Sequence, residues 1–169
     1  MLVILHTGQT GVERGADRAA RAVGTEVSGF CSFEKRDEIG VLPPEILADL
    51  SPCAARGARS ALRATLETAT VLVIVVQNRA SPNAETGVEA LRRNARKANV
   101  PVRIVDPESD LVALANELHE LENGRVMITG PRGTRWPAGE RLGWRVVAEL
   151  ALNAPQVTDL VAVQRVRAS

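Results

Sequence analysis

Short apolar runs recur along the whole chain, and longer segments with the apolar spacing of helices lie between them. Four of the runs are almost entirely apolar and a fifth is less regular, and we expect strands at Leu2–Leu5, Glu26–Cys31, Val71–Val76, Val102–Val105 and Arg125–Thr129. Apolar residues three to four positions apart predict helices at Val12–Val23, Cys53–Ala69, Ala84–Ala98, Ser109–Glu122 and Ala138–Asn153. This alternation indicates an α/β fold in three layers, with helices on both faces of a mostly parallel sheet.

The length of the chain fits one ordinary domain, because it has 169 residues and a mass of 18.1 kDa. We expect residues 1–153 to form a single ligand-binding domain. Residues 154–169 form a C-terminal tail in which Leu160, Val161 and Val163 alternate with smaller residues. This pattern predicts either an extra strand or a contact with a neighbouring subunit.

Several classes of protein are excluded by the pattern of apolar residues and cysteines. The longest apolar run, Val71–Val76, is much shorter than the roughly 20 residues that span a membrane, and the opening run is too short for a secretory signal. Cys31 and Cys53 show no CxxC spacing, so the sequence predicts neither a disulfide framework nor a structural zinc site. We therefore expect a cytoplasmic protein with no membrane partner and no bound metal.

The charges of the chain nearly cancel, since 21 basic residues face 20 acidic ones and the net charge is +1. Such a balance gives no overall field that would gather nucleic acid, so any anion site has to be local. Only Lys35 and Lys97 are lysines, and the other basic residues are arginines. Arginine can bind phosphate with two hydrogen bonds, whereas lysine acts as a point charge. Genome composition is nevertheless the favoured explanation of the excess of arginine.

The first expected strand leads into a loop that contains two glycines and then into a helix. In parallel sheets, ligands bind beyond the carboxyl ends of the strands, where helix amino termini present amides to anions. Glycine lets the backbone approach a ligand closely, so the segment is typical of a phosphate cradle. Its candidate binding residues are Thr7, Gly8, Gln9, Thr10, Gly11 and Arg14. As an alternative without a ligand, Thr10 and Glu13 fit a capping box at the start of the helix.

The last expected strand leads into a second loop with cationic side chains. Gly130, Pro131 and Arg132 follow this strand directly, and Arg135 and Trp136 come shortly after. An arginine fork suits phosphate oxygens, and a tryptophan in a loop can stack on a flat ring. The alternative is a rigid turn with solvated arginines and a tryptophan folded onto the surface. We expect Arg132 to be the residue that contacts an anion.

The ends of the two remaining strands favour helix capping over binding. Thr86 or Asn83 is placed to cap the helix that follows the Val71–Val76 run, and Glu89 lies three residues beyond Thr86. The segment from Asp106 to Ser109 carries acceptors and no cation, which predicts a turn and a cap.

Four groups of residues together resemble the molybdenum cofactor carrier family of the Rossmann-like SLOG superfamily. In chain order they are Gly8–Arg14, then Gly29–Cys31 with Glu38 and Gly40, then Thr86, then Gly130–Arg132. The likeness extends over roughly residues 3–150. It implies a Rossmann-like fold, a homo-oligomer, and a pocket for a phosphate-bearing cofactor or nucleotide. The resemblance implies that the first loop and the Gly130–Arg132 loop form this pocket, with Thr86 on a third wall.

This chain departs from the family pattern at several positions. The Gly-Gly pair that precedes Gln in the family is Thr7-Gly8 here, and Trp-Cys-Pro is Phe30-Cys31-Ser32. The family's Ser-Gly-Gly-Thr loop corresponds to residues 82–86, which lack both glycines and carry Glu85 at the position where a phosphate is expected.

Two functions of different classes follow from these residues. The first is a carrier that binds the molybdenum cofactor or a related nucleotide without catalysis. The alternative is a nucleotide phosphoribohydrolase of the same superfamily, in which Glu89 is the catalytic residue. His6 and His119 are the only histidines and suggest no Ser/His/Asp triad, since His119 is expected at a helix surface. Nucleic-acid binding is disfavoured because the chain lacks a basic stripe with interleaved aromatic residues.

Overall fold

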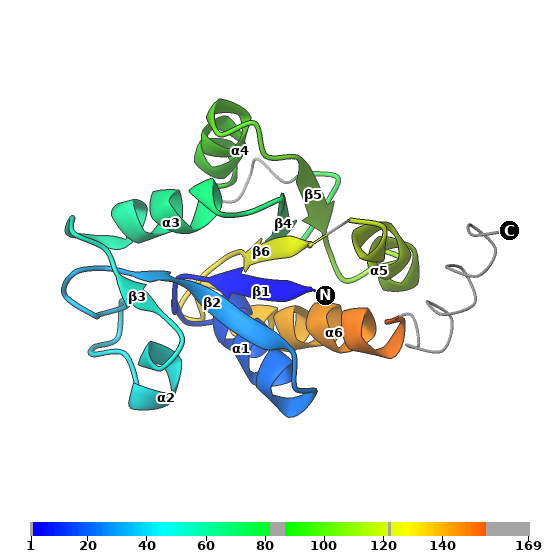
Figure 1. Cartoon of the computed structure of the whole chain (residues 1–169). Helices are drawn as coiled ribbons and strands as arrows, with labels where there is room; N and C mark the ends of the chain where they lie inside the picture. The colour runs from blue at the N-terminus through cyan, green and yellow to red at the C-terminus, as the bar shows by residue number, and fades with distance from the viewer. Residues whose placement is uncertain (1, 82–86, 122, 155–169) are drawn as a thin grey trace, which may run out of the picture.

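A computed structural model describes residues 2–81, 87–121 and 123–154 of the chain. Its centre is a six-stranded sheet in which every neighbouring pair of strands is parallel (Figure 1). In chain order the strands are β1 (Val3–His6), β2 (Glu26–Cys31), β3 (Ser51–Pro52), β4 (Val71–Val75), β5 (Val102–Val105) and β6 (Arg125–Thr129). They are arranged in space as β3-β2-β1-β6-β4-β5. The last strand along the chain therefore lies beside the first, with Ile4 of β1 opposite Val126 of β6.

Helices cover both faces of this sheet. They are α1 (Val12–Ala22), α2 (Pro44–Leu47), α3 (Ala58–Glu67), α4 (Val88–Lys97), α5 (Leu111–His119) and α6 (Gly139–Leu152). Figure 1 shows α1, α5 and α6 on one side of the sheet and α3 and α4 on the other. The arrangement confirms the predicted α/β Rossmann-like fold. Within the described ranges, no helix is long and apolar enough to cross a membrane.

Two apolar cores lie between the sheet and its helices. Val71, Val73 and Val75 belong to the core beneath α1, α5 and α6, whereas Leu72 and Ile74 belong to the core beneath α3 and α4. This division follows from the alternation of side chains along a strand. It explains why the β4 run is apolar throughout, since all of its residues are buried. A third, small cluster under α2 consists of Cys31, Leu42, Ile46 and Leu50.

The helices α1 and α6 approach each other closely at two glycines. A Cβ atom on Gly15 would lie 1.9 Å from the Glu140 carbonyl oxygen, and one on Gly143 would lie 2.2 Å from the Val12 carbonyl oxygen. Only glycine allows this contact. It holds the amino termini of the two helices side by side, and with them the loops that lead into both helices.

The structure corrects several predicted boundaries. The strand expected at Leu2–Leu5 is shifted by one residue, because His6 continues the ladder opposite Gly29. The helix expected from Cys53 begins only at Ala58, because Cys53 donates its amide to Cys31 beside β3. Neither β3 nor α2 was predicted, since two and four residues are too short to show a period.

Two further helices also begin later than expected. The helix predicted from Ala84 begins at Val88, directly after Gly87, whose φ of 100° is not helical. Residues 82–86 lie outside the described part of the chain. The helix predicted from Ser109 begins at Leu111, because Asp110 is its N-cap and accepts a hydrogen bond from the Ala113 amide at 3.0 Å.

Candidate functional site

The loops that follow β1 and β6 are in contact, because these two strands are neighbours in the sheet. Thr10 accepts a hydrogen bond from the Gly133 amide on its Oγ1 atom at 2.9 Å. A Cβ atom on Gly11 would lie 2.5 Å from the nitrogen of Gly133 and 2.7 Å from the carbonyl oxygen of Pro131. The two loops in which the sequence predicts a ligand site therefore form one continuous surface.

The first loop is hydrogen-bonded to the buried carboxylate of Glu13, a residue that is 3% exposed. One oxygen of this carboxylate accepts from the Thr7 amide and hydroxyl, both at 2.8 Å, and from the Gln9 amide at 3.1 Å. The other oxygen accepts from the Thr129 hydroxyl at 2.8 Å. The predicted capping box is therefore wrong: the N-cap of α1 is Gly11, without a side-chain cap. Glu13 instead satisfies the amides of the buried loop.

A second buried network joins the end of β1 to α1. The His6 ring is completely buried, and its Nδ1 atom accepts from the Gly8 amide at 3.0 Å. We therefore assign the ring proton to Nε2, which donates to Asp17 Oδ1 at 3.1 Å. Asp17 also accepts from Arg21 Nε at 2.9 Å, and Arg21 reaches Asp49 at 2.8 Å. Both nitrogens of His6 are thus engaged, and the ring holds the loop in place.

The pKa of Asp17 reflects this network. Burial raises the pKa of the Asp17 carboxyl, but hydrogen bonds from His6 and Arg21 outweigh burial and hold this pKa below its ordinary value. The hydrogen bond between Arg21 and Asp17 raises the pKa of the Arg21 guanidinium, although burial opposes this shift. Asp17 is therefore ionised in the folded protein and neutralises Arg21.

Arg14 connects the first loop to the segment that follows β2. Its Nε donates to the Gly8 carbonyl at 2.9 Å, and its Nη2 donates to Asp37 Oδ2 at 2.6 Å. The other oxygen of Asp37 accepts from the amides of Ile39 and Gly40, both at 2.9 Å. The Asp37 side chain is 1% exposed. The cation predicted in the first loop is thus fully paired with an acid from elsewhere in the chain.

Asp37 lies at the tip of a small hairpin formed by residues 35–42, which we call the acidic hairpin. Its two arms are joined by an antiparallel bridge between Arg36 and Val41 and by a hydrogen bond from the Leu42 amide to the Lys35 carbonyl at 2.9 Å. The Asp37 amide donates to the Gly40 carbonyl at 2.9 Å and closes the tip. Through Glu38 and Asp37, the hairpin contacts Thr10 and Arg14, which follow the carboxyl end of β1.

The neighbouring residue, Glu38, contacts both ligand-site loops. Its Oε1 accepts a hydrogen bond from the Thr10 hydroxyl. Its Oε2 lies 3.9 Å from Arg132 Nε and is buried, and no hydrogen-bond donor in the described part of the chain reaches it. The Arg132 side chain is 44% exposed. An acidic group therefore lies between the two loops from which the sequence predicts a phosphate site.

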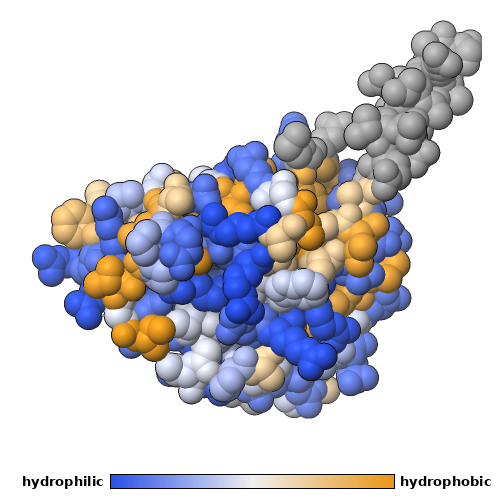
Figure 2. Space-filling model, turned by 90° about the horizontal axis from the view of Figure 1, so that it is seen from below, coloured by the Kyte–Doolittle hydropathy of each residue, from blue (hydrophilic) through white to orange (hydrophobic). Residues whose placement is uncertain are grey.

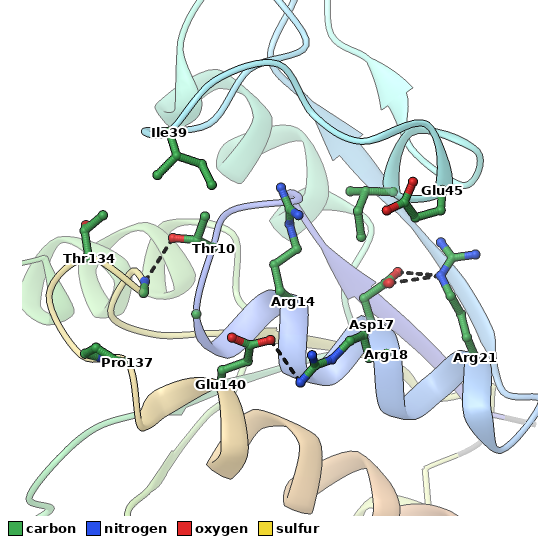
Figure 3. Close-up of a pocket in the computed structure, with 13 residues that line it drawn as sticks. Thr10, Arg14, Asp17, Arg18, Arg21, Ile39, Glu45, Thr134, Pro137 and Glu140 are labelled. Atoms are coloured by element: carbon green, nitrogen blue, oxygen red, sulfur yellow. Dashed lines mark hydrogen bonds and ion pairs between the residues drawn. The ribbon is translucent and has the colours of Figure 1, made fainter.

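A cleft of about 640 Å³ opens beside these loops along α1 (Figure 3). It is lined by Thr10, Gly11, Arg14, Asp17, Arg18, Arg21, Ile39, Glu45, Ile46, Gly133, Thr134, Pro137 and Glu140. The arginines lie along one side of α1, and Arg18 pairs with Glu140 at 2.9 Å. Figure 2 shows this side of the molecule, with a band of strongly hydrophilic side chains between apolar patches. The cleft is thus mixed in charge.

The other predicted residues of the two loops serve the packing around this surface. A Cβ atom on Gly8 would touch Leu50 and Ile46, at 3.0 and 3.1 Å, so Gly8 packs on the cluster under α2. Gln9 is 8% exposed, and its Oε1 is buried with no hydrogen-bond partner in the described residues. A Cβ atom on Gly130 would lie 2.6 Å from the Val75 carbonyl oxygen, so the second loop starts against β4.

The remaining predicted residues lie away from the two loops or outside the described ranges. Thr86 and Asn83, the predicted caps, lie outside the described residues, and the N-cap of α4 is Gly87. Glu89 is exposed on the first turn of α4 and does not line the cleft. The tail from residue 155 onward also lies outside the described part.

Three residues with weaker predictions are also placed. Trp136 packs against the core beneath α6 and is only partly buried, which agrees with the alternative of a folded-down ring. His119, predicted at a helix surface, is partly buried, and its Nε2 lies 2.6 Å from the Leu150 carbonyl oxygen of α6. Asp106 forms the predicted turn and accepts from the Ser109 hydroxyl at 2.8 Å.

Sequence reasoning missed the acids that pair with the predicted cations. Asp37 carries no local pattern that marks it as the partner of Arg14, whereas Asp17 and Arg21 have the i,i+4 spacing of an ion pair on a helix, a signal that could have found this pair. Glu38 was noted only within the family resemblance. Because Arg14 and Asp37 lie far apart in the chain, no spacing rule could have found that pair. Among the described residues, no three His, Cys, Asp or Glu side chains gather in the manner of metal ligands.

Comparisons with known proteins agree with the fold. No curated protein matches the sequence. The crystal structure of a candidate molybdenum carrier protein from Syntrophus aciditrophicus is similar, with a TM-score of 0.74 and 16% sequence identity. The similarity covers 88% of this chain and 93% of that one, and at this identity it shows a shared fold. The model of the circularly permutated YpsA SLOG family matches residues 4–151, and the chain therefore belongs to this family.

Proposed function

We propose that this protein binds a small molecule that carries a phosphate group and holds it without converting it. The ligand we propose is the molybdenum cofactor or a related nucleotide. The description of the structural relative as a candidate molybdenum carrier supports this choice of ligand. Membership of the SLOG family supports a binding role at the carboxyl edge of the sheet.

One observation carries the proposal: an anionic group already lies at the junction of the two loops. The Glu38 carboxylate contacts the Thr10 hydroxyl of the first loop and faces Arg132 of the second. A hydroxyl and a guanidinium aimed at one carboxylate are also suitable donors for a phosphate oxygen. Arg132 is 44% exposed, so a ligand can reach it.

The proposed binding residues are those predicted from the sequence. They are Thr7, Gly8, Gln9, Thr10, Gly11, Arg14, Thr86, Gly130, Pro131 and Arg132. Within this set, we assign direct contact with the phosphate to Thr10 and Arg132. Arg14 has a supporting role, because it is bound to Gly8 and Asp37.

No observation favours the phosphoribohydrolase alternative. Its required acid, Glu89, is exposed on α4, and the Thr86 position needed beside it lies outside the described residues. We therefore propose binding alone. We also propose that the chain forms a homo-oligomer, with residues 154–169 as a subunit contact.

The experiment that tests the binding site replaces Arg132. We expect Arg132→Ala to weaken the binding of guanosine monophosphate by about ten- to a hundredfold, because a charge-assisted hydrogen bond is worth about 1.5–3 kcal/mol. Calorimetric titration measures this change. The matched control is Arg135→Ala, which removes an exposed arginine from the same loop and should change the affinity less than about twofold.

The outcome that contradicts the site is equal affinity in the wild type, Arg132→Ala and Arg135→Ala. The natural ligand is identified separately, by native mass spectrometry of the protein purified from its own host. A retained molybdopterin or nucleotide mass agrees with the proposal, and a retained ligand without phosphate contradicts it.

A further inference from the structure

We propose that Glu38 controls access to the anion site: its carboxylate occupies the position of the ligand's phosphate, and the ligand binds by replacing it. This inference rests on the proposed function, because it assigns the anion site to Thr10 and Arg132. It adds a competitor for the site that is part of the chain itself.

Glu38 lies between the two loops of the proposed site. Its Oε1 accepts from the Thr10 hydroxyl, and the same Thr10 oxygen accepts from the Gly133 amide at 2.9 Å. On the other side, Glu38 Oε2 faces Arg132. One carboxylate therefore contacts both loops, through a hydrogen bond from the first and an ion pair with the second, and a phosphate cannot take its place while Glu38 remains there.

Two neighbouring acids on the acidic hairpin differ in how well their oxygens are hydrogen-bonded. Asp37 is 1% exposed and uses both oxygens, one on Arg14 at 2.6 Å and the other on two amides of the hairpin tip. Glu38 has one oxygen that is buried without a hydrogen bond, and its nearest cation is 3.9 Å away. Asp37 is thus firmly bound, whereas Glu38 is poorly satisfied. A buried polar atom without a partner is costly, so the release of Glu38 removes a penalty.

The acidic hairpin can stay in place when the Glu38 side chain moves. Asp37 keeps the tip of the acidic hairpin on Arg14, and Leu42 anchors its end in the cluster under α2. Ile39 and Val41 are exposed and lie outside the apolar cores. Only the Glu38 side chain therefore needs to rotate outward, and the fold need not open.

The release of Glu38 relieves its unsatisfied oxygen but also breaks two contacts, which every anionic ligand has to replace. A phosphate must break the Thr10 hydrogen bond and the Arg132 attraction of Glu38, and the displaced carboxylate then repels it. Removal of the charge at position 38 should therefore strengthen anion binding. This direction is opposite to that expected if Glu38 contacts the ligand favourably.

The test uses inorganic phosphate as the probe and the isosteric change Glu38→Gln in the full chain. We expect the dissociation constant for phosphate, measured by calorimetric titration, to fall by about five- to tenfold, because one opposing charge is removed from a partly buried site. The matched control is Glu45→Gln, since Glu45 is an exposed acid that lines the cleft beside the two loops. It should change the constant less than about twofold, which accounts for the general charge of the cleft.

A second variant tests the same position in a different way. Glu38→Ala leaves room for an external carboxylate, so acetate should compete with phosphate in this variant and not in the wild type. Thermal melting without phosphate checks that each variant folds. If Glu38→Gln does not fold, Glu38→Ala decides the question through acetate competition.

Each result has one meaning. Tighter binding in Glu38→Gln alone supports the inference. Equal tightening in Glu45→Gln, or unchanged or weaker binding in Glu38→Gln, overturns it and leaves the proposed function standing. If neither the wild type nor Glu38→Gln binds phosphate or guanosine monophosphate, the proposed function fails and this inference fails with it.

Discussion

Buried acidic residues organise the end of β1. Glu13 binds the amides of the first loop, Asp17 binds His6 and Arg21, and Asp37 binds Arg14. A buried carboxylate is costly unless it is paired or hydrogen-bonded, and each of these three accepts several donors. Together they fix the loop before any ligand arrives, which reduces the entropy that binding has to overcome.

The Asp17 network leads to a prediction about stability and pH. We expect Asp17→Asn to lower the free energy of unfolding at pH 7 by about 3 kcal/mol, because the change removes the buried carboxylate that accepts from both His6 and Arg21. The folded-state pKa of Asp17 lies below its ordinary value, so its contribution is present above about pH 4 and is lost as the pH falls further.

Urea unfolding at pH 7 and at pH 3 measures this effect. The difference in stability between the two pH values should become smaller in Asp17→Asn, though not zero, since the pKa of Asp106 is also lowered by its hydrogen bonds. Asp49→Asn is the control, because Asp49 pairs with the same arginine at the surface. That variant should cost less than about 1 kcal/mol. Equal losses in the two variants would show that burial of Asp17 is unimportant.

At the scale of helices and strands, the contact between α1 and α6 determines where the two loops meet. Gly15 and Gly143 let the helix backbones touch, which brings Gly11 against Gly133. The distance between the loops is therefore set by small residues inside two helices, at positions remote from any ligand.

This contact predicts a clear effect of one added methyl group. Gly143→Ala places a Cβ atom 2.2 Å from the Val12 carbonyl oxygen, and a backbone atom cannot move aside cheaply. We expect the free energy of unfolding to fall by about 2 kcal/mol or more, although alanine favours helices by about 1 kcal/mol. In the control Gly124→Ala, the one close approach of the new atom is to the flexible end of the Leu2 side chain, at 2.5 Å. A loss no larger in Gly143→Ala than in this control, measured by urea unfolding, contradicts the prediction.

Most strands and helices could be predicted because their apolar patterns are long enough to show a period. The β4 and β6 runs are buried on both faces and need no alternation to be recognised. The short elements β3 and α2 could not be predicted, since β3 depends on its pairing with β2 and α2 packs on Cys31 of β2, earlier in the chain. Helix starts were placed too early where a glycine with positive φ precedes the helix, as at Gly57 and Gly87.

At the scale of the whole molecule, strand order explains why the two loops of the proposed site meet, since β1 and β6 are neighbours in the sheet. Ligands bind beyond the carboxyl ends of parallel strands, so glycine and arginine after β1 and β6 were informative by themselves. The contribution of the acidic hairpin could not be inferred in this way. It depends on a return of the chain over β1, and Asp37 and Glu38 resemble ordinary surface acids in the sequence.

The last prediction concerns the division of the chain at residue 153. Every helix and strand of the described structure lies within residues 3–152, as do all three apolar clusters. A chain that ends at residue 153 should therefore melt within a few degrees of the full chain and bind guanosine monophosphate equally well.

Leu152 at the end of α6 is 77% exposed, and the tail that follows carries Leu160, Val161 and Val163. Apolar residues of this kind favour burial against another subunit. We thus expect light scattering to give a smaller assembly for the shortened chain than for the full one. A shortened chain that does not fold would contradict the proposed domain boundary, and an unchanged mass would contradict the role of the tail in assembly.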